Sequence, residues 1–204
     1  MADHDFDTES SETVYAGKIL ALRVDDVRMP GDAVARREVV EHFGAVAVVA
    51  LDENDRVAMV YQYRHPVGRR LWELPAGLLD VGGEAPVLTA ARELHEEAGL
   101  AAENWSVLVD LVTSPGFADE SVRVFLATGL SLIDRPAAEH EEADLKLDWL
   151  PLAEAVRRVL SGEIVNSIAV AGILAAHAAT DRSALRPADS PWIDKPHAFA
   201  ARQG

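Results

Sequence analysis

The stretch Arg92-Glu93-Leu94-His95-Glu96-Glu97-Ala98-Gly99-Leu100 closes a segment, from about Glu84 to Ala98, that we predict to be a helix. Pro86 suits the first turn of such a helix and Gly99 suits its C-terminal stop. With 3.6 residues per turn, one narrow apolar stripe of this helix should be buried. The stripe consists of Val87, Ala91, Leu94 and Ala98.

Three glutamates, Glu93, Glu96 and Glu97, fall roughly opposite this stripe, on a face that we expect to be unburied. Glu93 and Glu97 are one turn apart, and like charges at that spacing destabilise a bare helix by about 0.2–0.5 kcal/mol per pair. A bridging divalent cation would offset the repulsion, and hard oxygen ligands suit Mg²⁺ or Mn²⁺. On these three residues alone, however, a solvated acidic helix face is the more common explanation.

The surrounding residues favour the metal. Gly77, Glu84 and residues 92–100 together resemble the Nudix box, whose pattern is G-x5-E-x7-R-E-U-x-E-E-x-G-U with U aliphatic. One departure is that six residues rather than five separate Gly77 from Glu84. We expect the extra residue in the Val81-Gly82-Gly83 loop, where glycine tolerates an insertion. The resemblance implies a metal-dependent hydrolase that splits the diphosphate of a small nucleotide derivative.

The same resemblance assigns roles to the helix. It implies that Glu93 and Glu97 are metal ligands, and that Glu96 is a third carboxylate, acting directly or through water. Arg92 would orient the glutamates through charge-assisted hydrogen bonds. Glu84 would support the helix entrance.

A further metal ligand is implied outside the helix. The turn Pro75-Ala76-Gly77 would present the backbone carbonyl of Ala76 to the metal. The expected cofactor is Mg²⁺ or Mn²⁺, which keeps several waters and completes its shell with substrate phosphates.

Three features outside the box resemble ADP-ribose pyrophosphatases. The first is Tyr61-Gln62-Tyr63-Arg64 followed by Trp72-Glu73-Leu74-Pro75-Ala76-Gly77, and the second is Pro115, sixteen residues after Gly99. The third is a β-rich N-terminal extension, which resembles the dimerisation sheet of that subfamily, a sheet that reaches into the partner's active site. The resemblance therefore implies a homodimer that hydrolyses ADP-ribose to AMP and ribose 5-phosphate.

Substrate contacts follow from the same resemblance. Arg64 would hold a phosphate or the ribose, which a planar guanidinium suits. Arg36 and Arg37 would reach the nucleotide of the other subunit. The backbone at Leu78 would lie near the diphosphate, and Glu120 would bind ribose hydroxyls.

A hydrolase also needs a base for the attacking water, and glutamates bound to metal are poor candidates because their lone pairs are committed. A second acidic cluster, Glu139-His140-Glu141-Glu142, precedes an expected strand at Leu145. In the ADP-ribose subfamily such a loop supplies the catalytic glutamate. Glu142 is the first choice, with Glu139 and Glu141 behind it, and a merely solvated loop is the alternative.

The remaining pattern predicts an α+β fold: a Nudix-type α/β/α sandwich in residues 44–204, preceded by an antiparallel, dimer-forming β-sheet in residues 1–43. The turn Pro30-Gly31-Asp32 separates the two N-terminal strands. The tail from Asp181 is expected to lie over the surface or a partner. The other expected elements are a hairpin of 45–51 with 56–63, strands at 71–74, 105–113, 122–128 and 145–150, and helices at 152–160 and 164–179.

Composition limits the partners. The 204 residues include 19 basic and 34 acidic ones, for a net charge of −15, which repels nucleic acid and anionic membranes. The absence of cysteine and the acidic N-terminus, unlike a signal peptide, suit the cytoplasm. The apolar run 164–179 is shorter than the roughly 20 residues needed to span a bilayer, so we interpret it as a buried helix.

Two alternatives stay open. A nucleotide sugar, a dinucleoside polyphosphate or NADH as substrate would keep the box but not require the spacing of Pro115. A Nudix-like ligand-binding regulator would be expected to lose box glutamates and to carry a DNA-binding module, whereas the glutamates here are intact.

Overall fold

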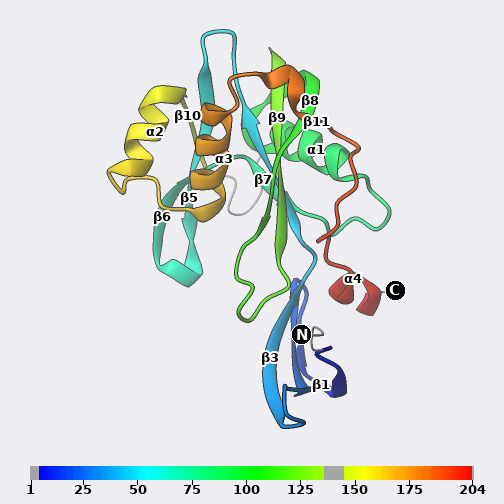
Figure 1. Ribbon diagram of the computed structural model, residues 1–204. Coiled ribbons are helices and arrows are strands. Elements are labelled where there is room, and N and C mark those ends of the chain that lie inside the picture. Colours follow the sequence, from blue (N-terminus) through cyan, green and yellow to red (C-terminus); the bar gives the residue numbers. More distant parts are fainter. Residues whose placement is uncertain (1–4, 136–144, 204) are drawn as a thin grey trace. The chain divides into compact units, whose positions relative to one another are not determined.

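The computed structural model describes residues 5–135 and 145–203 (Figure 1). The chain divides into two compact units. Unit 1 is assembled from three separate segments, and unit 2 from two. The segments of unit 1 are Met1–Gly44, Val112–Ser121 and Asp194–Gly204, and those of unit 2 are Ala45–Leu111 and Val122–Ile193.

Unit 1 is built on an antiparallel sheet with the strand order β1-β2-β3. Its strands are β1 (Thr8–Ala16), β2 (Leu20–Arg28) and β3 (Val34–His42). The predicted turn at Pro30-Gly31-Asp32 joins β2 to β3, with positive φ at Gly31 and Asp32. β1 was not predicted, because its first six residues are polar and every one of its residues is exposed.

Two later segments complete unit 1. Residues 112–121 reach β3 through a parallel bridge between Val40 and Ala118. The helix α4 (Ala198–Arg202) packs against β3, and the buried ring of Phe199 meets Phe43 edge-on with 4.6 Å between ring centroids. The C-terminus is therefore part of the core of this unit.

Unit 2 contains a five-stranded mixed sheet with the order β11-β8-β9-β4-β7. Within it, β4 runs parallel to β9 and antiparallel to β7. The segment expected as the turn Pro75-Ala76-Gly77 thus contributes an edge strand. The strands are β4 (Ala45–Ala50), β7 (Ala76–Leu78), β8 (Leu100–Val112), β9 (Ser121–Leu132) and β11 (Arg186–Pro187).

A second, antiparallel sheet has the order β10-β5-β6. Its strands are β5 (Arg56–Arg64), β6 (Arg69–Glu73) and β10 (Lys146–Pro151), and the 3₁₀ turn η1 (His65–Val67) joins β5 to β6. The expected hairpin of 45–51 with 56–63 is wrong. The turn forms, with the Asp52 N–H donating to the Arg56 carbonyl at 3.0 Å, but β4 and β5 then separate into different sheets. The neighbours of β4 are β7 and β9, which come from distant parts of the chain.

Helices cover both faces of the larger sheet (Figure 1). The even residues of β4, such as Val46 and Val48, pack in one cluster with α1 (Pro86–Ala98). The odd residues, such as Ala47 and Val49, pack in another cluster with α3 (Ser167–Ala178). Because β4 is buried on both faces, its sequence is continuously apolar rather than alternating. The predicted α/β/α sandwich is confirmed.

The ends of the helices follow local signals. Gly99, with φ of 64°, ends α1, and its N–H donates to the His95 carbonyl at 2.9 Å. The side chain of Asn166 caps α3, so this helix begins a few residues later than predicted. The helix α2 (Leu152–Leu160) packs against α3. In the part of the chain that the structure describes, no helix has the length and apolar character needed to cross a membrane.

The tail of unit 2 is anchored rather than loose. After the 3₁₀ turn η3 (Arg182–Ala184), β11 pairs with β8. The buried guanidinium of Arg123 donates to Asp110 and to the carbonyls of Ser190 and Pro191, at 2.7–3.1 Å. The tail was expected to lie over the surface. The structure adds that its strand β11 forms an edge of the five-stranded sheet.

A candidate metal centre on helix α1

The edge strand β7 lies directly beside the glutamate face of α1. A Cβ atom built on Gly77 would overlap the carboxyl group of Glu93. Gly77 has no side chain, so Glu93 can pack against the backbone of β7, and its own side chain is only 13% exposed. The first glycine of the sequence motif is thus explained by close packing against one of the motif's glutamates.

Glu97 is buried in the same place. The residue is 6% exposed, and its Oε2 accepts the backbone N–H of Ala76 at 3.0 Å. This corrects the expectation that the glutamate face is not the buried one. Helical periodicity placed Glu97 away from the apolar stripe, but β7 covers that side of the helix as well.

Burial changes the acidity of both side chains. Desolvation by burial and the charge of Glu96 together raise the pKa of Glu93 to about 7, against the opposing effect of Arg92. Desolvation and the charge of Glu93 together raise the pKa of Glu97 to about 8, although the hydrogen bond from the Ala76 amide acts in the opposite direction. Two carboxyls that repel one another, one buried and one largely buried, are the donor set that a divalent cation would stabilise. The residues present therefore fit a hard metal ion.

Arg92 holds the neighbouring carboxylates in place. Its Nη1 donates to Glu93 Oε1 at 2.7 Å and to Glu96 Oε2 at 3.1 Å, and its Nη2 lies 3.4 Å from Glu84 Oε2. Glu84 is itself held by the buried Thr89, whose hydroxyl donates to it at 2.7 Å and lowers the pKa of its carboxyl. Arg92 thus contacts three carboxylates at once, and Thr89 is a partner of Glu84 that the sequence did not reveal.

The carbonyl of Ala76 faces away from the sheet. The N–H of Val48 donates to the Pro75 carbonyl at 2.9 Å, and hydrogen-bonded and non-hydrogen-bonded pairs alternate along an antiparallel ladder. The next pair, Ala47 with Ala76, is therefore a non-hydrogen-bonded one. Both the N–H and the C=O of Ala76 then point outward from β4, and the N–H meets Glu97.

The carboxylates do not by themselves enclose a metal. Among residues 5–135 and 145–203, no three His, Asp or Glu side chains are gathered as a ready metal site. The reason is visible in the contacts: Arg92 draws Glu96 toward itself, whereas Glu97 turns to the Ala76 amide. A bound ion would need backbone, water or phosphate oxygens to complete its shell, which is usual for Mg²⁺.

Arg64 belongs to the same unit and is held rigidly. Its Nε and Nη2 donate to the carboxylate of Glu73 at 2.7–3.1 Å, and Gln62 Nε2 donates to the same carboxylate at 3.2 Å. Glu73 is 3% exposed, whereas the Arg64 side chain is 40% exposed. The charges of Arg64 and Glu73 both act on the pKa of Glu97, so this pair lies near the metal-binding candidates. Sequence reasoning missed the role of Glu73.

The other predicted residues are distributed as follows. Leu78, in β7, pairs with Ala45. Arg36 and Arg37 are exposed on β3 and line a cavity of unit 1 together with Phe117. Glu120, also in unit 1, accepts a hydrogen bond from the Thr113 hydroxyl. The structure thus gathers Ala76, Arg92 and the three glutamates of α1 in unit 2, whereas in unit 1 Arg36 and Arg37 have other neighbours than Glu120.

The structure does not describe the predicted base. Glu142, with the alternatives Glu139 and Glu141, lies outside the described residues.

The fold and the glutamates of α1 together define a class of protein. The family model of the NUDIX domain matches residues 41–167, which is more than half of the chain. The model of the nucleoside diphosphate sugar hydrolase N-terminal domain matches residues 6–40. The chain belongs to the Nudix hydrolase family.

Comparison with individual proteins finds relatives with a named activity. The chain is 68% identical to an ADP-ribose pyrophosphatase of Mycobacterium tuberculosis, over 100% of this chain and 99% of the relative. It is 39% identical to an ADP-ribose pyrophosphatase of Bacillus subtilis, over 78% of this chain and 86% of that protein. A solved ADP compounds hydrolase shares the fold, with a TM-score of 0.77 at 19% identity, covering 90% of this chain and 98% of that chain.

Proposed function

We propose that the protein hydrolyses ADP-ribose to AMP and ribose 5-phosphate with the help of Mg²⁺ or Mn²⁺. The observation that carries the proposal is the pair of Glu93 and the buried Glu97 beside β7, in a chain 68% identical over its full length to an ADP-ribose pyrophosphatase. A pair of carboxyls with raised pKa values is destabilising by itself and becomes favourable when it shares a cation.

The chain's own residues would divide the work as follows. Glu93, Glu97 and the Ala76 carbonyl would hold the metal, with Glu96 as a third carboxylate and Arg92 orienting the glutamates. When bound, the metal would supply charge neutralisation for the diphosphate and Lewis-acid polarisation.

Arg64 would bind a phosphate or the ribose, because Glu73 presents its guanidinium in a fixed orientation. The backbone at Leu78 would lie near the diphosphate. Glu142 would take the proton of the attacking water as a P–O bond forms and the anhydride P–O bond breaks. The oxygen of the broken bond would leave with the departing phosphate.

Unit 1 would complete the enzyme as part of a homodimer. Arg36 and Arg37 would contact the nucleotide of the other subunit, and Glu120 would contact the ribose hydroxyls. We propose residues 1–43 as the dimerisation segment and residues 44–204 as the hydrolase domain. The exposed apolar side chains of Val14 and Tyr15 on β1, each 59% exposed, support a role for this sheet in association.

One observation favours a second substrate class. The N-terminal match is to the model of nucleoside diphosphate sugar hydrolases, which makes a nucleotide sugar the second candidate. Both substrates place a diphosphate between a nucleoside and a sugar, so the metal site would serve either.

The deciding experiment compares ADP-ribose with a nucleotide sugar, a dinucleoside polyphosphate and NADH in the presence of Mg²⁺. We expect the highest kcat/KM for ADP-ribose, with equal amounts of AMP and ribose 5-phosphate as products. The Glu93→Gln and Glu97→Gln variants are the controls and should lose most turnover. A higher kcat/KM for another compound would overturn the ADP-ribose assignment. Light scattering on the full chain tests the homodimer, which a monomeric mass would contradict.

A further inference from the structure

The loop of residues 113–120 in unit 1 has a defined internal structure. The N–H of Thr113 donates to the Glu120 carbonyl at 3.2 Å and closes its two ends. Inside it, the N–H groups of Phe117 and Ala118 both donate to the Ser114 carbonyl, at 3.1 and 2.9 Å. Glu120 therefore stands at the closing point of an ordered loop.

This loop is attached to the end of β3. The N–H of Val40 donates to the Phe117 carbonyl at 2.7 Å, and the N–H of Asp119 donates to the Val40 carbonyl at 3.0 Å. A third bond comes from a side chain: Asp119 Oδ1 accepts the N–H of His42 at 2.8 Å. The Asp119 carboxylate thus continues the backbone ladder by one further bond.

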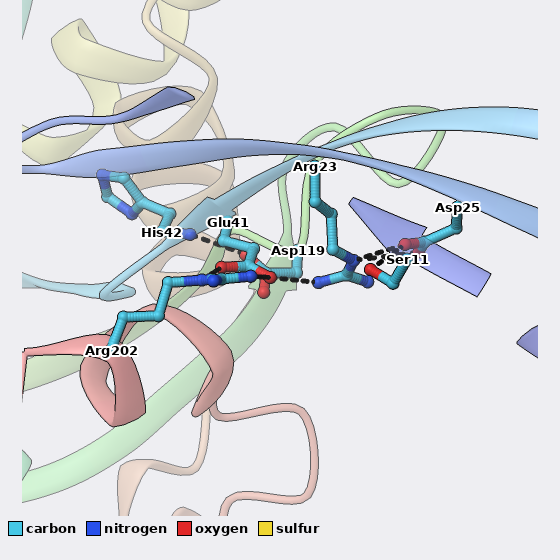
Figure 2. A network of polar contacts seen from close by, with 7 residues as sticks. All are labelled: Ser11, Arg23, Asp25, Glu41, His42, Asp119 and Arg202. Carbon is cyan, nitrogen blue, oxygen red and sulfur yellow. Dashed lines mark hydrogen bonds and ion pairs between the residues drawn. The ribbon is translucent and has the colours of Figure 1, made fainter. Parts of the chain in front are cut away.

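The neighbouring residue of β3 is held by two arginines (Figure 2). Glu41 is 1% exposed, and Arg23 Nη1 donates to its Oε1 at 2.6 Å. Arg202 of α4 donates to both carboxylate oxygens of Glu41, including a bond from Nη2 to Oε1 at 2.9 Å. The C-terminal helix thereby fixes β3 beside the residue that Asp119 binds.

Arg23, in β2, is itself held by Asp25 of the same strand, and Asp25 is bound in turn by Ser11 of β1. Arg23 Nε donates to Asp25 Oδ2 at 2.9 Å, and Asp25 Oδ1 accepts the Ser11 hydroxyl at 2.6 Å (Figure 2). The network therefore connects β1, β2, β3 and α4 and ends at the attachment point of the loop.

The position of Asp119 is not explained by charge pairing. Burial raises the pKa of its carboxyl, and the charge of Glu41 raises it further. The bond from the His42 amide and the charges of Arg23 and His42 act in the opposite direction. Because the surroundings of Asp119 disfavour a negative charge, we infer that its side chain matters as the hydrogen-bond acceptor of the His42 amide rather than as a charge.

We propose that Asp119 is a positioning residue for Glu120: by accepting the His42 amide it fixes the 113–120 loop on β3, in the orientation in which Glu120 meets substrate. The proposal rests on the proposed function, in which Glu120 contacts the ribose hydroxyls. The ion pair of Arg202 with Glu41 supports the same strand from the C-terminus.

The test compares three substitutions of Asp119. Asp119→Ala removes the acceptor, Asp119→Leu removes it while keeping the branched shape, and Asp119→Asn keeps the acceptor oxygen without the charge. The matched control is Asp181→Ala, in unit 2, which also removes a carboxylate that accepts a backbone amide, that of Ser183 at 3.0 Å. Steady-state kinetics and amide hydrogen exchange are measured on each full-length variant.

We expect the Ala and Leu variants to raise KM by about tenfold, with kcat within about threefold of the wild type. Exchange at the His42 amide and in residues 113–120 should be faster in the same two variants. The Asn and control variants should match the wild type in both measurements. If either the Ala or the Leu variant folds and keeps the wild-type KM, or if Asn fails to restore it, the proposal is overturned.

Failure of the proposal is distinguishable from failure of the proposed function. If another compound of the substrate panel replaces ADP-ribose, only the assigned substrate fails, and the Asp119 variants are measured with that compound. The Glu120→Ala variant tests separately whether Glu120 contacts the substrate. If it leaves KM unchanged for every compound that is hydrolysed, Glu120 has no substrate contact and the positioning role falls with it.

Discussion

The carboxyl group of Glu93 packs so closely against the backbone of Gly77 that a Cβ atom at position 77 would overlap it. This contact links the edge strand β7 to the helix α1, and it places a candidate metal carboxylate against the backbone of β7. A substitution at Gly77 should therefore disturb the proposed metal site without replacing the side chain of any proposed ligand.

Gly77→Ala should displace the Glu93 carboxyl and weaken Mg²⁺ binding. Because small displacements of catalytic groups are costly, we expect kcat/KM to fall by about 10²-fold. Gly82→Ala is the matched control, since a Cβ at Gly82 would meet nothing within 4 Å. Calorimetric titration of Mg²⁺ and steady-state kinetics measure both effects. Wild-type Mg²⁺ affinity in Gly77→Ala would refute the proposed role of this contact.

The metal-free protein should lose stability as the pH rises from about 4.5 to 8. The pKa values of Glu93 and Glu97 are raised to about 7 and about 8, so the folded state binds more protons than the unfolded state in this interval. The free energy of unfolding therefore falls with rising pH, because deprotonation leaves two poorly solvated charges that repel one another.

Urea unfolding in the presence of EDTA measures this dependence. Saturating Mg²⁺ should reduce it, since the cation stabilises the deprotonated carboxyls. The double variant Glu93→Gln, Glu97→Gln should show a flatter profile than the wild type with EDTA and no response to Mg²⁺. The same steep profile in the double variant would show that other groups cause it.

Glu73→Gln should raise KM about tenfold with a smaller effect on kcat. The reason is that the charge-assisted bonds from Arg64 to the buried Glu73 carboxylate set the orientation of its guanidinium. Glu154→Gln, which removes the partner of Arg158 at 2.9 Å in α2, is the control for loss of an ion pair in the same unit. Steady-state kinetics of both variants decide, and a KM equal to that of the control would mean that Arg64 does not depend on Glu73.

Glu142→Gln should lower kcat by about 10²–10⁴-fold while KM changes only a few-fold, because glutamine cannot accept a proton from water. Kinetics across a Mg²⁺ series separate a base from a ligand, since added Mg²⁺ should substantially rescue a variant that has only lost metal affinity. Glu139→Gln and Glu141→Gln are measured alongside. A wild-type rate in Glu142→Gln would remove this residue from the proposed mechanism.

Features that depend on near neighbours in the chain were predictable. The turn at Pro30-Gly31-Asp32 and the end of α1 at Gly99 follow from backbone preferences of single residues. The resemblance implied the pairing of Arg92 with the glutamates, and for Glu96 it agrees with helix spacing, because residues four positions apart are neighbours on a helix.

Features that depend on distant partners were not predictable in the same way. β1 is entirely exposed and its residues 8–13 are polar, so its sequence carries no apolar alternation, and only its pairing with β2 makes it a strand. β4 and β5 follow one another closely but join different sheets, because β4 lies between β7 and β9.

The sequence by itself determined the helix with its three glutamates, because a helix of fixed period converts spacing into adjacency. The resemblance of residues 77–100 to the Nudix box indicated the family and the class of chemistry. Only the tertiary structure decided that Glu97 is buried, that Gly77 accommodates Glu93, and that Glu73 holds Arg64. It also built unit 1 from three segments, joining the C-terminal helix to β3 through Arg202 and Glu41. These relationships arise from the packing of elements far apart in the chain, which no local pattern of residues encodes.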